Sequence, residues 1–340
     1  MNKKTKLLFN IIFFISLVLL TGYIVLKDQN IFEIFGIISS AKVEFLLIGV
    51  LCMLLYMFCE AINIGRTLKI LNEKSSFLKN LKYALIGFFF SSITPAASGG
   101  QPMQIYYMYK DKIAVSNSTL ALLINLTSMQ IITISFALVS LIFNYQYLDK
   151  GLIIFFVIGV LLNSSALALL VVGIFSKRLS RALINFAIKV LTFFKIKNIE
   201  TKKEKLENEL IKYQNSAVYI SNNKKTMTKI LVMTLIQFTL YYSITYWTYR
   251  ALGFSEYNAF QIITMQSVLY ATVSGIPSPG AVGVTEAAFM QIFKSVYPKG
   301  VMSSAILVNR GINFYLFLII SGIVTAINHL DSKENSYYST

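Results

Sequence analysis

Three ionisable side chains lie inside otherwise apolar stretches of the sequence: Glu60, Glu286 and Arg310. Inserting such a group into a bilayer costs about 2.5–3.5 kcal/mol, so each is a candidate for function. The carboxylates suit a cationic ligand, and the guanidinium suits an anionic one. A fourth candidate, Arg66, follows Glu60 at the edge of the same apolar stretch. Structural alternatives stay open: Glu60 as an interfacial carboxylate, and Glu286 as a helix-dipole partner that pairs with Arg310.

Two segments rich in Pro and Gly interrupt apolar stretches, SSITPAASGGQP at 91–102 and SGIPSPGAVGVTE at 274–286. A regular helix does not continue through such a segment, because Pro lacks the backbone donor and Gly adds backbone freedom. Pro102 suits the first position of a new half-helix. Thr285 suits the N-cap of another, with Glu286 in its first turn. The candidate binding residues of these segments are Gly99, Gly100, Gln101, Pro102, Pro279, Gly280, Gly283, Thr285 and Glu286.

Half-helices that begin inside a membrane present free N–H groups, and helix N-termini approached by Gly-rich backbone attract anions such as phosphate. The two interruptions and Arg310 therefore offer anion-binding elements, whereas Glu60 and Glu286 offer cation-binding ones. A zwitterionic or amine-bearing phospholipid head group would satisfy both sets. The alternative is that Pro and Gly only kink helices for packing.

Enzyme motifs do not accompany these residues. Two cysteines, Cys52 and Cys59, and one histidine, His329, make neither a disulfide framework nor a metal cluster. The sequence contains no P-loop, no H-E-x-x-H and no G-x-S-x-G elbow. We therefore expect no catalytic residue, no metal and no cofactor.

The composition is that of a polytopic membrane protein. Of 340 residues, 56% are hydrophobic and 14% are charged, whereas soluble domains carry roughly 25% charged residues. A spanning helix needs about 20 apolar residues. Six stretches meet this length, and the first is too long for a cleaved signal peptide. The predicted spans are 7–26, 45–65, 113–148, 151–176, 230–249 and 301–328.

The interrupted stretches, 83–109 and 257–285, are better explained as re-entrant hairpins, because their halves are too short to cross. Residues 83–93, for example, would rise only about 16 Å as a helix. With re-entrant hairpins, every Lys/Arg-rich segment falls on the cytoplasmic side, including 177–229 with its 13 basic residues. The first hairpin then opens from the cytoplasm and the second from outside. The predicted fold is all-α, with six transmembrane helices and two oppositely oriented hairpins that resemble an inverted repeat.

The domain division follows from these spans. Residues 1–330 form the integral membrane domain, and 331–340 form a polar C-terminal tail. The basic insert at 176–229 contains an amphipathic helix at 179–194 and a charged helix at 199–213, which suit anionic lipids of the inner leaflet. A plain connecting loop is the alternative. We expect both termini in the cytoplasm and no nucleic-acid partner, and a homodimer is left open.

The segments 91–110 and 275–289 resemble the two characteristic loops of the lysylphosphatidylglycerol synthase transmembrane, or flippase, family. LVNRGINFYLFLIISG at 307–322 and EAINIGRTLKIL at 60–71 are similar to two further family motifs. The resemblance implies a protein of the bacterial plasma membrane that translocates a polar or aminoacylated lipid. The first loop departs from the family at 96–98, where more glycine is expected. The residues that match motif positions are Pro95, Gly99, Gly100, Pro102, Pro279, Gly280, Gly283, Glu286 and Arg310.

Longer family members add a soluble aminoacyl-transfer domain, which we expect to be absent after Asp331. The first functional hypothesis is therefore flipping of a phospholipid such as lysyl-phosphatidylglycerol. The alternatives are a phosphatidylglycerol lysyltransferase, which uses lysyl-tRNA and protects against cationic peptides, and a small-solute secondary transporter.

Overall fold

A computed structural model describes residues 31–144, 150–176, 222–276 and 278–337, together with positions 178, 181–182, 207–208, 211 and 213–219. All regular secondary structure in these residues is helical. Five helices are long and apolar enough to cross a membrane: Val43–Ile70, Val115–Phe143, Ile153–Val172, Lys224–Ala251 and Lys299–His329. They correspond to five predicted spans, while the predicted span at 7–26 lies outside the described residues. The protein is an all-α membrane protein.

The helices at the centre of the fold are α3 (Val43–Ile70) and α10 (Lys224–Ala251), which pack along their whole length. They run antiparallel: the Lys42 N–H donates to the Ala251 carbonyl at 2.9 Å, and at the other end Asn63 Nδ2 donates to Thr234 Oγ1 at 3.0 Å. Around them lie α2 (Ile31–Ser39), α6 (Val115–Asn144) and α7 (Lys150–Phe175). The pair provides the frame on which the interrupted segments pack.

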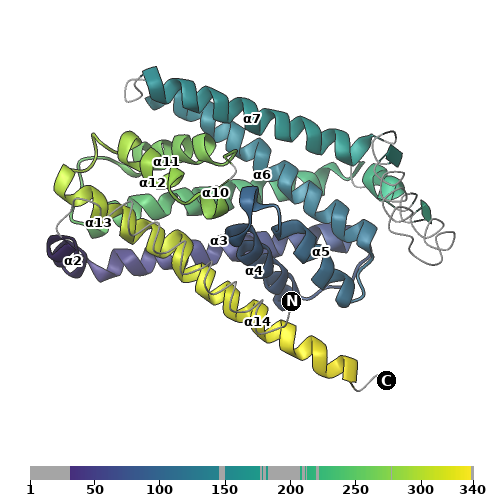
Figure 1. Cartoon of the computed structure of the whole chain (residues 1–340). Coiled ribbons are helices and arrows are strands. Elements are labelled where there is room, and N and C mark those ends of the chain that lie inside the picture. The colour runs from purple at the N-terminus through teal and green to yellow at the C-terminus, as the bar shows by residue number, and fades with distance from the viewer. Residues whose placement is uncertain are drawn as a thin grey trace.

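Each interrupted segment forms a helical hairpin. The first consists of α4 (Phe77–Ile93), the 3₁₀ turn η1 (Pro95–Ala97) and α5 (Gly100–Lys110). The second consists of α11 (Ala259–Val273), η3 (Pro279–Ala281) and α12 (Val284–Ile292). They occupy opposite halves of the molecule along the helix direction (Figure 1), and η1 contacts η3. The tips of the two hairpins therefore meet, while their re-entrant paths and the count of six spans stay predictions.

The last predicted span differs from expectation. It consists of α13 (Lys299–Arg310), a π-helical turn η4 (Gly311–Tyr315) and α14 (Leu316–Tyr337). The widened turn begins directly after Arg310, so this residue lies at a break in the helix. The helix α14 also continues into the predicted polar tail. Further upstream, α2 lies between the predicted spans 7–26 and 45–65, where no helix was predicted. The helix α4 begins at Phe77, six residues before the predicted half-helix at 83.

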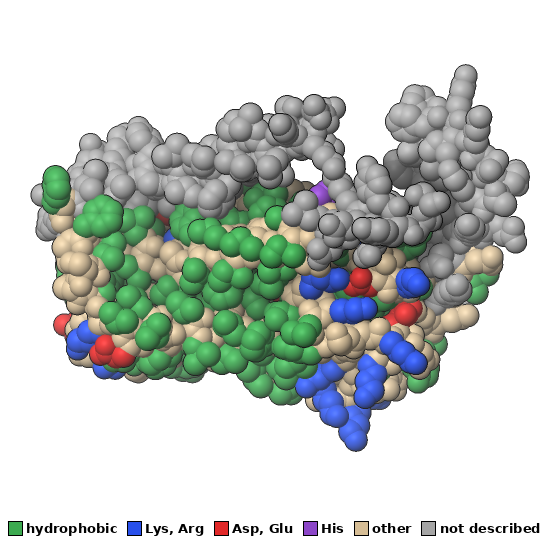
Figure 2. Space-filling model, turned by 90° about the horizontal axis from the view of Figure 1, so that it is seen from below, with side chains coloured by type: hydrophobic (Ala, Val, Ile, Leu, Met, Phe, Trp, Pro, Cys, Tyr) green, Lys and Arg blue, Asp and Glu red, His purple; other side chains and the backbone are tan. Residues whose placement is uncertain are grey.

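The molecular surface agrees with a membrane environment. On the face seen in Figure 2, hydrophobic side chains cover the middle, and most of the Lys and Arg side chains gather toward one end. Large apolar side chains of α6 and α7, such as Ile142 and Leu161, are more than half exposed. Exposed apolar surface on helices long enough to span a membrane is typical of contact with lipid. The predicted insert helices at 179–194 and 199–213 lie largely outside the described residues.

Candidate functional site

The two hairpin tips share part of their backbone conformation, although the residues that follow the turn differ: Ser98 is helical and Val282 is extended. Thr94 (φ −119°, ψ 145°) and Ser278 (φ −116°, ψ 137°) precede a 3₁₀ turn that begins with proline in both cases. The third residue of each turn, Ala97 or Ala281, has a positive φ, 53° and 50°. Non-glycine residues adopt this region uncommonly. Two tips that share this entry into the turn and approach each other from opposite halves agree with an inverted repeat.

The half-helices begin two residues earlier than the sequence indicated. Gly99 and Gly283 are the N-cap residues of α5 and α12. The prediction of Thr285 as N-cap was therefore wrong, and so was that of Pro102 at the first helical position. Gly283 has a φ of 85°, which glycine adopts without steric cost. Pro102 is tolerated third in its helix because N–H groups of the first turn have no intrahelical acceptor.

Glu286 and Arg310 form a buried ion pair. Arg310 Nε lies 2.9 Å from Glu286 Oε1, and their side chains are 6% and 0% exposed. The N–H is not well aligned with the oxygen, so the contact is chiefly one of charge. The other oxygen, Oε2, accepts from the Gly283 N–H at 2.6 Å. The carboxylate therefore caps its own helix, so the N-terminus of α12 already holds an anion.

Arg310 also holds the second tip in place. Its Nη2 donates to the Gly280 carbonyl at 3.1 Å, and its guanidinium lies 4.2 Å from the centre of the Phe314 ring. Gly280 has a φ of 58°, and a Cβ there would overlap the Phe314 ring and lie 3.2 Å from the Ser92 carbonyl of the first hairpin. Only glycine permits this approach, so the tip-to-tip contact depends on Gly280.

The N-terminus of α5 differs from that of α12, because no carboxylate occupies it. Thr94 Oγ1 accepts from the Gly99 N–H at 2.9 Å. No described side chain accepts a hydrogen bond from the N–H groups of Gly100 and Gln101. Gln101 is half-buried and Pro102 is exposed. The N-terminus of α5 therefore holds no carboxylate, and a helix N-terminus of this kind suits an anion.

Glu60 is connected to the first hairpin through Gln104. Gln104 Nε2 lies 3.4 Å from Glu60 Oε1 and donates to the Tyr83 carbonyl at 3.1 Å. The amide fills the space where a Cβ at Gly87 would lie, so α5 approaches α4 closely at this point. Glu60 is half-buried and forms no ion pair with a described residue.

A tyrosine cluster interacts with both Glu60 and Arg310. Tyr241 is 5.1 Å from Tyr56 and 5.9 Å from Tyr270, measured between ring centres. Glu60 interacts electrostatically with Tyr56 and Tyr270, and Arg310 interacts with Tyr241. Hydroxyl groups donate and accept hydrogen bonds, so the cluster joins the two charged centres by groups that suit either end of a zwitterion. The sequence reasoning missed it, although the aromatic run YYSITYWTY at 241–249 indicates it.

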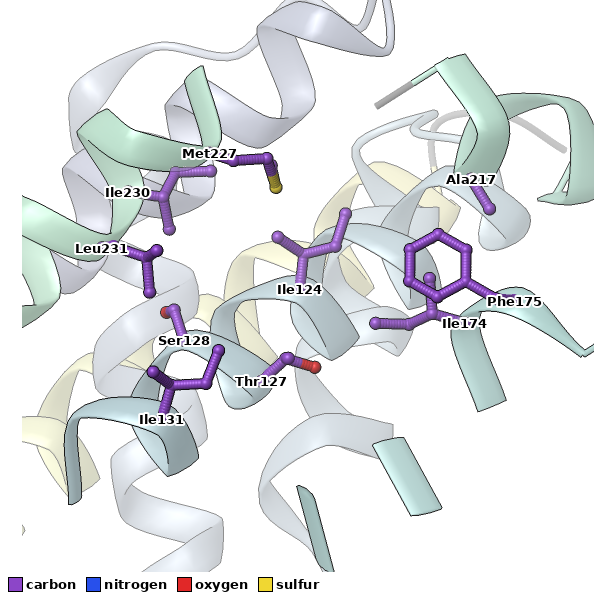
Figure 3. A pocket seen from close by; sticks show the side chains of 10 residues that line it. All are labelled: Ile124, Thr127, Ser128, Ile131, Ile174, Phe175, Ala217, Met227, Ile230 and Leu231. Carbon is purple, nitrogen blue, oxygen red and sulfur yellow. The ribbon is translucent and has the colours of Figure 1, made fainter. Parts of the chain in front are cut away.

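Arg66 does not belong to this centre. Its Nη1 donates to the Lys229 carbonyl at 3.0 Å, and it lies at the far end of α3 with other basic side chains. A separate cavity of about 120 Å³ lies between α6, α7 and α10 (Figure 3), and no ionisable side chain lines it. In the described part of the chain, no cluster of His, Cys, Asp or Glu could hold a metal ion.

Comparison with known proteins agrees with this architecture. The family described as the lysylphosphatidylglycerol synthase TM region matches residues 7–321. A UPF0104 membrane protein of Pyrococcus horikoshii is 24% identical over 303 residues, which cover 86% of this chain and 89% of that protein. The family match includes both hairpins, the tyrosine run and Arg310. The chain therefore belongs to the lysylphosphatidylglycerol synthase transmembrane-region family.

Proposed function

We propose that the protein translocates a polar or aminoacylated phospholipid, such as lysyl-phosphatidylglycerol, across the plasma membrane, with the head group passing between the two hairpin tips. The observation that carries the proposal is the contact of η1 with η3 beside the buried pair of Glu286 and Arg310. Polar backbone at membrane depth is tolerated only inside protein or along a watery path. Membership of a family described by a lipid synthase's membrane region supports a lipid substrate.

The chemistry of the centre matches both ends of such a head group. The phosphate would lie near the N-terminus of α5, at Gly100 and Gln101, with Arg310 as a buried cation. A lysyl ammonium would be compensated by Glu60, which lacks a cationic partner of its own among the described residues. The tyrosine hydroxyl groups would bridge the two positions, and the acyl chains would stay in the surrounding lipid.

The membrane orientation is part of the proposal. The basic ends of α3, α4 and α10 would face the cytoplasm, with both termini on that side, because Lys and Arg are retained there. The first hairpin would then open toward the cytoplasm and the second toward the outside. A head group could reach the tips from either leaflet.

The experiment is a leaflet assay in proteoliposomes that contain lysyl-phosphatidylglycerol, using an amine-reactive dye that does not cross membranes. The dye first reacts with all lysyl-phosphatidylglycerol in the outer leaflet. The reappearance of unreacted lipid in that leaflet is then followed over time. We expect Arg310→Ala and Glu286→Ala to slow reappearance at least tenfold, because each leaves a buried charge without its partner. Glu44→Gln, a change at an exposed carboxylate at the start of α3, is the control.

Unchanged reappearance in both alanine variants, at equal reconstitution, would reject the site. Two further measurements separate the alternatives. Expression in a strain that lacks lysyl lipid would produce new lysyl-phosphatidylglycerol only if the chain were a lysyltransferase. Uptake of labelled free lysine without lipid movement would indicate a small-solute carrier.

A further inference from the structure

A second polar site lies away from the hairpin tips, at the C-terminal end of α3. There, a groove of about 650 Å³ is formed by the last turns of α3, the following turn and the start of α4. Its lining includes four basic side chains and two serines: Arg66, Lys69, Lys74, Lys79, Ser75 and Ser76. The concentration of cations in one concavity distinguishes it from a scattered positive surface.

The carboxylate in the groove does not neutralise these cations. Glu73 Oε1 accepts from the Ala114 N–H at 3.2 Å and from Asn117 Nδ2 at 2.8 Å, so it is directed to the start of α6. In the described part of the chain, neither Lys69, Lys74 nor Lys79 forms an ion pair. The groove therefore has four basic side chains against one carboxylate, although Lys79 also interacts electrostatically with Asp111.

The walls of the groove are fixed by short contacts. Ser75 Oγ donates to Asn80 Oδ1 at 2.5 Å, and the Asn80 amide occupies the space where a Cβ at Gly65 would lie. Arg66 is held by the Lys229 carbonyl of α10. The start of α4 at Phe77 adds the partial positive charge of a helix N-terminus. A preorganised groove loses little conformational entropy when a ligand binds.

We propose that this groove binds a phosphate group, either as the head group of an anionic phospholipid or as free phosphate. Three lysines, one arginine and the Ser76 hydroxyl group can donate hydrogen bonds to the oxygens of a phosphate, whereas the Ser75 hydroxyl already donates to Asn80. Retention of lysines on the cytoplasmic side accounts for basic residues at this end, but it does not require them to converge on one groove. The proposal does not depend on the proposed translocation, and its test measures only binding to the purified protein.

The test uses purified full-length protein in a neutral detergent and two probes: dihexanoyl-phosphatidylglycerol and inorganic phosphate. The variant Lys69→Gln/Lys74→Gln/Lys79→Gln removes three groove charges. The matched control, Lys112→Gln/Lys224→Gln/Lys225→Gln, removes three exposed lysines outside the groove lining. We expect the groove variant to weaken binding of at least one probe on the order of tenfold. The control should change it less than about threefold, because its three lysines lie outside the groove and salt screens charges at a distance.

Each outcome decides the proposal. Loss of both probes in the groove variant supports a site for phosphate in either form, and loss of the lipid alone assigns it to the head group. Equal weakening in both triple variants would show only general electrostatic attraction and would overturn the proposal. Absence of binding of either probe to the unaltered protein would also overturn it. Monodispersity and thermal unfolding establish that both variants are folded.

Discussion

The substitution Glu286→Gln removes the charge of this side chain but keeps the shape of the side chain. We expect it to destabilise the protein strongly. In Glu286→Gln the amide oxygen can still accept from the Gly283 N–H, which the carboxylate accepts at 2.6 Å. The ion pair with Arg310, however, is lost. The guanidinium then stays buried, since its side chain is only 6% exposed, without a compensating carboxylate.

The magnitude follows from the geometry. Two unit charges 2.9 Å apart interact by about 6 kcal/mol at an effective dielectric constant of about 20. Relaxation and the residual contacts of Arg310 with the Gly280 carbonyl and the Phe314 ring reduce the net effect. We therefore expect Glu286→Gln to lower the free energy of unfolding by about 3–5 kcal/mol, as for other buried pairs that lose one partner.

The assay is SDS-induced unfolding in mixed micelles, carried out on a double-mutant cycle with Arg310→Gln. Removal of both charges should restore part of the loss, because neither partner is then left uncompensated. We expect a coupling energy of about 2–4 kcal/mol. Glu44→Gln, the same change at an exposed site, should cost about 0.5 kcal/mol or less. A coupling energy below about 0.5 kcal/mol would refute the view that the two charges stabilise each other.

Three further predictions concern other parts of the fold. Gly280→Ala should cost about 1–3 kcal/mol in the same SDS assay, since the residue has a φ of 58° and faces an aromatic ring; Gly311→Ala, with open space around it, is the control. Tyr241→Phe should slow lipid reappearance severalfold yet change stability by less than about 1.5 kcal/mol, and an unchanged rate would exclude its hydroxyl from the path. Partial burial favours a raised pKa at Asp111, but hydrogen bonds from Lys82 and Tyr83 outweigh it and lower that pKa. Its stabilisation is therefore present above about pH 4 and lost as the pH falls below that value, so Asp111→Asn should flatten the fall in unfolding temperature between pH 5 and 3.

The sequence predicted the helical class and five of the described long helices because hydrophobicity and length alone determine whether a helix can span a membrane. It also located both interruptions, since Pro and Gly act on the backbone locally. Their contact could be anticipated only through the inverted-repeat argument. The predicted starts of α5 and α12 each lay two residues after the observed ones. The N-cap residues Gly99 and Gly283 have no side chain that a sequence pattern for capping could detect.

The features that the sequence did not predict depend on contacts between distant segments. Tyr56, Tyr241 and Tyr270 come from three helices, and no local pattern shows that their rings meet. The π-helical turn after Arg310 was missed for a related reason. Its five residues are compatible with an ordinary helix. The turn follows Arg310, whose guanidinium contacts the second hairpin, and this contact between distant segments is not evident from the sequence.

The position of this π-helical turn bears on how a head group could pass. A buried ion pair contributes little net stability compared with apolar residues of similar volume, so stability alone gives no reason for Glu286 and Arg310 to lie where the hairpins meet. π-Helical turns are frequent at functional sites, and this one joins α13 to α14 directly after Arg310. An incoming phosphate could replace Glu286 as the partner of Arg310 without leaving either charge uncompensated, provided that an ammonium group of the head group moves to Glu286. A lysyl head group carries two ammonium groups, so one can do this while the other stays near Glu60. A zwitterionic head group meets that condition within one molecule, whereas a simple anion does not, and the proposed path should therefore favour the former.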